Sequence, residues 1–235
     1  MDKKQKVTRV IIIFIALILF IFLIAQFLPI FKELLTEEGR NNFKVTIQSL
    51  GSKGVLALIG LMCSQILLPI LPGEPVEILA GMCFGPIKGL IVVLIGAFIS
   101  TILIIVLIKV LGKKFIYTLI NEEKVKKIEN SKFFKDKKKI DILIFLLFFI
   151  PGTPKDILIY IAVLLPINIT RFMFISLFAR IPSVISSTLA GSSLVDENFV
   201  FSIGVYVVTF AITAVFIYFV NIKDKNILKA VDEIK

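Results

Sequence analysis

Two short segments of this chain combine helix-breaking residues with a carboxylate. The first is Pro72-Gly73-Glu74-Pro75-Val76-Glu77-Ile78-Leu79, and Pro151-Gly152-Thr153-Pro154-Lys155-Asp156-Ile157-Leu158 follows 79 residues later. Five of the eight positions are identical, and Glu77 corresponds to Asp156. Repetition of a motif at a fixed offset is typical of an internally duplicated fold. Both segments lie in apolar sequence, where breaks and charges are unfavourable, so we expect the functional chemistry there.

Eight charged side chains lie inside apolar sequence, and their charges cancel: Glu74, Glu77, Asp141, Asp156, Lys88, Lys155, Arg171 and Arg180. Each charge at the centre of a membrane segment costs roughly 2.5–3.5 kcal/mol, so pairing or access to water is required. We expect Glu77 and Asp156 to approach each other across two hairpin tips, with Glu74 as a further coupling carboxylate. Burial and a nearby arginine would make such carboxylates a candidate proton switch.

The cations of this set are candidate phosphate ligands. Arg180, Lys155 and Arg171 are predicted to bind an anionic headgroup, because arginine in a hydrated cleft binds phosphate in bidentate fashion. The hairpin breaks would be formed by Pro72, Gly73, Pro75, Pro151, Gly152 and Pro154. In the competing interpretation the charges form ion pairs that only hold the hairpins in register, or face water at the tips and the membrane interface.

The composition excludes several classes of protein. The chain has 235 residues, of which 57% are hydrophobic, and a mean hydropathy of +0.98, which is typical of a polytopic membrane protein. It has no histidine and no phosphate-binding loop of the Walker type, and its two cysteines are predicted to be free thiols. No metal, cofactor, nucleic acid or enzymatic nucleophile–base pair is expected, and the serines after residue 182 are interpreted as packing residues.

The excess positive charge marks the orientation in the membrane. Residues 1–9 carry +3 and residues 109–139 carry +7. Together they equal the full net charge of +10, because the charges of all the other residues cancel. Positive segments favour the cytoplasmic side. Residues 10–28 and 87–108 then supply two crossings between the basic segments, so the apolar run from residue 55 is predicted to be re-entrant. Both termini would be cytoplasmic.

These segments predict an all-α polytopic membrane protein with about four full transmembrane helices and two re-entrant helical hairpins in an inverted repeat. The single membrane domain comprises a first span at 10–28, a first repeat at 50–110, a basic linker at 111–139, a second repeat at 140–195 and a last span at 199–220. A short loop is expected from Gly191 to Asn198, before the last span. Only 11 residues separate Lys139 from Pro151, too few to cross a bilayer as a helix. Inverted repeats with broken helices meeting near mid-depth are a common transporter architecture.

Several motifs resemble the DedA / VTT-domain superfamily, also called SNARE-associated Golgi proteins. They include Phe84-Gly85-Pro86-x-x-Gly89, Pro69-x-x-Pro72-Gly73-Glu74, Pro151 to Asp156, and Arg180-Ile181-Pro182-Ser183. Gln65 stands where DedA members usually have a glutamate, and Phe148 and Pro154 stand where many have an arginine, which favours the branch with the F-G-P-x-x-G turn. The resemblance implies opposed re-entrant hairpins and lipid handling, including recycling of polyprenyl-phosphate carriers, phospholipid flipping or scrambling, with proton or ion coupling.

Together these observations predict a flippase or scramblase of the cytoplasmic membrane for an anionic lipid. Undecaprenyl phosphate is the first expectation and a glycerophospholipid such as phosphatidylethanolamine the second, with protons or Na⁺ as the coupling ion. The alternatives are an ion-coupled transporter of small solutes and a membrane scaffold that transports nothing. Membrane lipids are the expected partners, and the sequence is compatible with a homo-oligomer.

Overall fold

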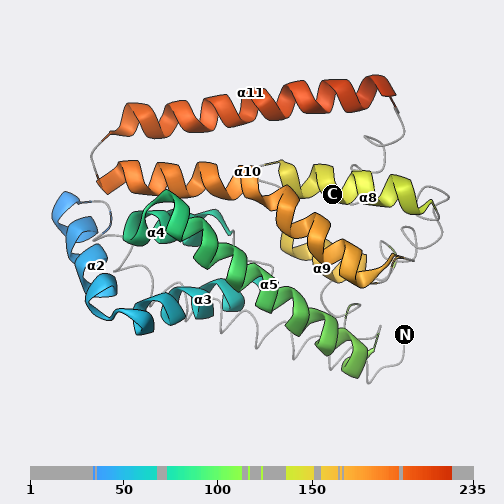
Figure 1. Ribbon diagram of the computed structural model, residues 1–235, viewed down its shortest axis with the longest axis horizontal. Coiled ribbons are helices and arrows are strands. Elements are labelled where there is room, and N and C mark those ends of the chain that lie inside the picture. Colours follow the sequence, from blue (N-terminus) through green and yellow to red (C-terminus); the bar gives the residue numbers. More distant parts are fainter. Residues whose placement is uncertain are drawn as a thin grey trace.

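The computed structural model describes residues 34, 36–67, 73–112, 116, 123, 136–150, 155–163, 165, 167–195 and 198–223. All the regular elements of this part of the chain are helices (Figure 1). They are α2 (Glu37–Ser49), α3 (Ser52–Leu67), α4 (Glu74–Phe84), α5 (Pro86–Leu111), α8 (Lys137–Phe149), α9 (Lys155–Ala162), α10 (Ile169–Val195) and α11 (Phe199–Lys223). The predicted all-helical fold is therefore confirmed.

Three helices are long and apolar enough to cross a membrane. The candidate spans are Pro86–Val110, Ile169–Val195 and Val200–Phe219, which match three of the four predicted full crossings. The predicted span at 10–28 and most of the basic linker at 111–139 lie outside the described residues. A fourth candidate is the pair α2 and α3, which is bent by 111°. The chain is a membrane protein, and its described residues contain three or four candidate spans.

The remaining helices are too short to cross alone. α3 has 16 residues and α4 has 11, and the corresponding helices of the second repeat, α8 and α9, have 13 and 8. At about 1.5 Å per residue even α3 covers roughly 24 Å, less than the hydrocarbon core. These lengths agree with re-entrant limbs, although the inserted depth and the inversion of the two repeats stay predictions. The connecting residues 68–72 and 151–154 lie outside the described part.

The helices of the two predicted repeats pack alike in part. α3 packs on α5 in the first predicted repeat, and α8 packs on α10 in the second. Between them, α4 packs extensively on α10 and α9 makes a smaller contact with α5. α4 also packs on α5, whereas α9 makes no comparable contact with α10 among the described residues, so the duplication of the fold stays a prediction.

Two glycines allow the extensive contact between α4 and α10. A Cβ on Gly81 would collide with the backbone of Thr188, and a Cβ on Gly191 would collide with the backbone of Ile78. Small residues at such crossings let helix backbones approach closely. The expectation that Gly191 begins a loop was wrong, because α10 continues to Val195 and uses this glycine for packing.

α4 is fixed at its C-terminal end by a turn and a hydrogen bond. Gly85 has a φ of 77°, a left-handed conformation that glycine adopts easily, and Pro86 then begins α5. The Gln48 side chain of α2 donates a hydrogen bond of 2.6 Å to the carbonyl of Cys83. Cys83 and Cys63 are free thiols, as predicted.

Candidate functional site

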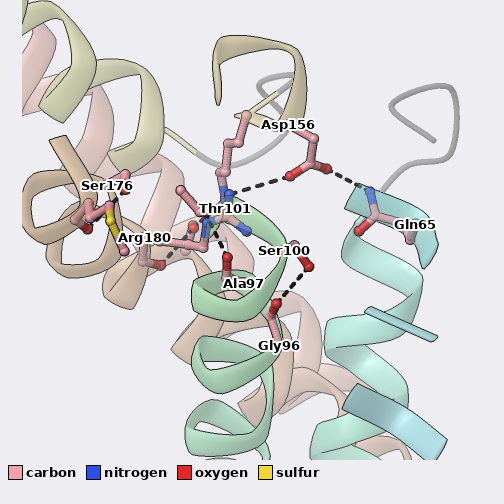
Figure 2. A network of polar contacts seen from close by, with 11 residues as sticks. Gln65, Gly96, Ala97, Ser100, Thr101, Asp156, Ser176 and Arg180 are labelled. Atoms are coloured by element: carbon pink, nitrogen blue, oxygen red, sulfur yellow. Dashed lines mark hydrogen bonds and ion pairs between the residues drawn. The ribbon is translucent and has the colours of Figure 1, made fainter. Parts of the chain in front are cut away.

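Asp156 joins three helices inside the protein. Its Oδ2 accepts a hydrogen bond of 2.6 Å from Gln65 Nε2 on α3, and its Oδ1 lies 3.4 Å from Arg180 Nη2 on α10 (Figure 2). The Arg180 side chain is only 3% exposed. Asp156 lies in the first turn of α9, where the helix dipole favours a negative charge. The carboxylate thereby connects the end of the first repeat's α3 to the second repeat.

A second hydrogen bond ties the same two helices together. The phenol of Tyr160, on α9, donates to the carbonyl of Leu67 at the end of α3 with a length of 3.0 Å. Helix C-termini leave carbonyls without intrahelical partners, and this contact satisfies one of them. The end of α3, before the first predicted break, and the start of α9, after the second, therefore lie together, although the bonded residues are about 90 positions apart in sequence.

Lys155 is a buried cation whose direct partner is a hydroxyl. It is 6% exposed, and its Nζ donates a hydrogen bond to Ser183 Oγ on α10. The Ser183 hydroxyl donates in turn to the carbonyl of Arg180. Lys155 also interacts electrostatically with Glu77, Glu74, Asp156 and Arg180. Lys155 and Arg180 thus lie close together, and their acidic neighbours are Asp156, Glu77 and Glu74. We call these five residues, with the polar side chains that contact them, the cluster.

Arg180 is held by the ring of Phe148 as well as by Asp156. Its guanidinium carbon lies 5.3 Å from the ring centroid of this fully buried phenylalanine of α8, within the range of a cation–π interaction. Pro182 lies inside α10 only two residues further on. Because proline has no backbone N–H, α10 lacks one hydrogen bond between successive helical turns next to the arginine.

Glu77 is the least satisfied of the acidic groups. It is 3% exposed, and its Oε2 has no hydrogen-bond partner among the described residues. It lies in the first turn of α4, where the helix dipole lowers the cost of a negative charge. Within the described part of the chain no hydrogen bond joins Glu77 to Asp156, but both interact electrostatically with Lys155. Their predicted direct approach stays a prediction.

The other predicted residues lie at different places. Glu74 is half-buried in the same turn as Glu77 and is part of the electrostatic surroundings of Lys155. Arg171 lies apart from the cluster, at the start of α10, where it pairs with Asp141 at 2.8 Å and has a side chain that is 63% exposed. Of the predicted hairpin breaks, Gly73 lies against the Gln65 side chain and Pro75 lies in α4. Pro72, Pro151, Gly152 and Pro154 lie outside the described residues.

Three polar residues of the cluster were not predicted as site residues. Gln65 and Ser183 are each 1% exposed and contact Asp156 and Lys155 directly. Tyr206, on α11, donates a hydrogen bond of 3.5 Å to Ser187 and interacts electrostatically with Glu77 and Glu74. An amide in an otherwise apolar run was the signal that could have identified Gln65, because such a group needs a partner when it is buried.

The arrangement gathers hydrogen-bond donors and charged groups in apolar surroundings. Lys155 has three N–H donors and Arg180 has five, whereas their contacts to the described residues are one hydrogen bond each. Ser183 is buried, and its hydroxyl donates to a backbone carbonyl rather than to a base. No cluster of three or more metal-ligating side chains occurs in the described ranges.

The comparison with known families identifies the domain. The VTT domain matches residues 71–193, more than half of the chain, from just before α4 almost to the end of α10. No curated protein and no solved structure gives a significant match. The matched region contains Glu77, Lys155, Asp156 and Arg180, whereas α2, α3 and α11 lie outside it. The chain therefore belongs to the VTT-domain family, the family of DedA and SNARE-associated Golgi proteins.

Proposed function

We propose that the protein moves an anionic lipid between the leaflets of the cytoplasmic membrane, with both termini on the cytoplasmic side. The family is generally of the transporter type rather than enzymatic. The main support for this proposal is the buried pair of Lys155 and Arg180. Lys155 donates to the Ser183 hydroxyl, and Arg180 Nη2 lies 3.4 Å from Asp156 Oδ1. A phosphate headgroup offers the oxygen acceptors that these donors require.

The proposed substrate is a polyprenyl phosphate such as undecaprenyl phosphate, with phosphatidylethanolamine as the second candidate. In this mechanism the headgroup binds Lys155 and Arg180 and displaces part of the interaction with Asp156. Released from Arg180, Asp156 would keep its hydrogen bond from Gln65. Glu77, which is buried near the same cations, would take up and release the coupling proton as the hairpins rearrange. Protons are the first candidate for the coupling ion and Na⁺ is the second.

The experiment is lipid translocation in proteoliposomes. A fluorescent lipid with a phosphate headgroup is placed in both leaflets, and a quencher in the outer solution reports exchange between them. We expect Arg180→Gln to lower the translocation rate at least about tenfold, because a buried charge-assisted contact is worth roughly 1.5–3 kcal/mol. Lys88→Gln removes an exposed lysine at the start of α5 and serves as the charge-matched control.

The coupling role is tested in the same vesicles. Glu77→Gln and Asp156→Asn should each alter the dependence of the rate on pH, because they remove groups that can exchange a proton. Unchanged rate and pH dependence in both variants would rule out coupling by these carboxylates. If Arg180→Gln leaves lipid translocation unchanged as well, the polar network only fixes the helices and binds no headgroup. Absence of translocation by the parent chain would favour the scaffold alternative.

A further inference from the structure

One face of α11 carries a row of hydroxyl groups, although the helix is otherwise composed mainly of valine, isoleucine and phenylalanine. The row follows a spacing of four and three residues, which places its members on one side of a helix. It consists of Ser202, Tyr206, Thr209 and Thr213, and Phe216 continues the same stripe. Ser202 and Thr213 are 7% and 3% exposed, whereas their neighbours Ile203 and Ile212 are 64% and 56% exposed. The hydroxyl row therefore faces the protein.

This row meets hydroxyls and backbone of α10. α11 lies along α10 at the edge of the molecule (Figure 1). Ser202 Oγ donates to the carbonyl of Ala190 at 3.1 Å, and the Tyr206 hydroxyl donates to Ser187 Oγ at 3.5 Å. Only 11% of the α11 span is buried, compared with 50% of the α10 span, so the two helices meet along a narrow line. We name this contact between the hydroxyl row of α11 and α10 the α10–α11 seam.

Two buried oxygens at the seam and beside it have no hydrogen-bond partner among the described residues. One is Thr213 Oγ1 and the other is Glu77 Oε2. Thr209 donates to the carbonyl of Val205 at 2.7 Å, as threonines in apolar helices commonly do, but Thr213 makes no such bond. Tyr206 donates to Ser187 on α10, and Ile78, which follows Glu77, lies against Gly191 four residues further along the same helix, so the seam lies near Glu77. Unpaired buried oxygens are unfavourable unless water or a ligand reaches them.

The seam is closed at one end. Phe216 packs on Phe145 and Phe149 of α8, with ring centroids 5.8 and 5.0 Å away. At the other end, the turn between α10 and α11 is polar and includes the exposed Asn198. Water could therefore enter the seam from the turn and would be stopped at the three aromatic rings.

We propose that the α10–α11 seam is a one-sided water path that carries protons from the α10–α11 turn to Glu77. The path runs past Ser202 and Tyr206, and its closed end lies beyond Thr213. The groups around Glu77 are Glu74 on its own helix, Lys155 on α9, Tyr206 on α11, and Arg180 with Asp156 beyond them. Delivery of protons for transport rests on the proposed function, whereas hydration of the seam does not.

Cysteine labelling tests the hydration directly. In a Cys63→Ala, Cys83→Ala background, Thr213→Cys and Thr209→Cys place thiols in the seam. Ile212→Cys and Val208→Cys, at the same depth on the exposed face, are the matched controls. A charged, membrane-impermeant methanethiosulfonate reacts with the thiolate, which forms only in contact with water, so we expect the seam thiols to react at least about tenfold faster than the controls.

Sidedness completes the test. Asn198→Cys marks the side on which the turn lies, and the seam thiols should react only when the reagent is added from that side of sealed vesicles. Adding Phe216→Ala should open the closed end and allow reaction from both sides. Seam thiols that react no faster than the controls, or that react equally from both sides with Phe216 in place, would overturn the proposal. If Thr213→Cys does not fold, Thr209→Cys carries the same test.

The path and the lipid transport can fail separately. Modification of Ser202→Cys, which lies between the turn and Tyr206, should shift the pH dependence of translocation and leave headgroup binding unchanged, since a blocked path slows proton delivery without touching Arg180. One-sided labelling of the seam without any lipid translocation would contradict the transport proposal and support the water path. Lipid translocation with unreactive seam thiols would support transport and contradict the water path.

Discussion

The two copies of the proline-glycine motif place their carboxylates in different surroundings. Asp156 contacts an arginine and an amide, whereas Glu77 is more deeply buried and its Oε2 has no partner in the described part of the chain. Both lie in the first turn of a short helix. The two motifs thus place an acid at the same position, but the contacts of the two acids differ. Asp156 joins neighbouring helices through direct contacts, whereas Glu77 Oε2 makes no hydrogen bond among the described residues and Glu77 interacts with Lys155 electrostatically, so we expect the two acids to have different roles.

Removing each acid tests this division most strongly. Asp156→Ala leaves Arg180 buried without its carboxylate, and we expect a loss of about 3–5 kcal/mol in the free energy of unfolding. Glu77→Gln should change it less, by about 1 kcal/mol, because Oε2 makes no hydrogen bond among the described residues and only the electrostatic interaction with Lys155 is lost. Thermal or denaturant unfolding in detergent measures both. Equal destabilisation by the two variants would remove the contrast between the copies.

A second change makes the paired copy dependent on pH. Gln65→Glu places a second carboxyl group where the amide now donates to Asp156, so two like charges meet beside Arg180. Repulsion between the carboxylates favours a proton on one of them and Arg180 opposes it, so the folded variant should bind part of one proton more than the unfolded chain at neutral pH. Its stability should therefore fall by at most about 1.4 kcal/mol per pH unit as pH rises above the range where a free glutamate titrates, near pH 4.3. Unfolding series at several pH values would reveal this slope, which the parent chain should lack.

The copies also differ in how their short helices are fixed. α4 is pressed against α10 at Gly81 and Gly191, and Gly191→Leu should cost about 1–3 kcal/mol because the added side chain meets backbone. Gly204→Leu, on the open side of α11, is the size-matched control and should have little effect. A comparable loss at both positions, seen as equal shifts in the unfolding midpoint, would argue against a close contact.

The smallest effect concerns the ring beneath Arg180. Phe148→Leu keeps an apolar side chain but removes the cation–π contact, and we expect a loss of about 0.5–2 kcal/mol and weaker headgroup binding. Phe174→Leu, at a position that is 60% exposed, controls for the change of residue type. Headgroup binding by fluorescence titration separates the two variants, and identical titrations would mean that the ring does not assist Arg180.

The sequence was sufficient to predict the elements that depend on local apolar runs. The spans at 87–108 and 199–220 lie within α5 and α11, and free thiols were predicted at Cys63 and Cys83. Gly191 was misassigned because a glycine looks the same in a turn and at a helix crossing until its neighbour is known. The grouping of Lys155, Asp156 and Arg180 followed from the cost of unpaired charge. Gln65 could have been recognised as a buried amide that needs a partner, but its partner and that of Ser183 could not be assigned, since they depend on how distant helices pack.

The hydrogen bond from Gln48 to the Cys83 carbonyl couples the interior to the surface. This hydrogen bond links the polar helix α2 to the end of α4, which carries Glu77. A displacement of α4 would therefore also move α2, which has exposed residues that can be labelled. An environment-sensitive dye on the exposed Asn42 would therefore report a displacement of α4 through a residue that lies outside the buried charged groups.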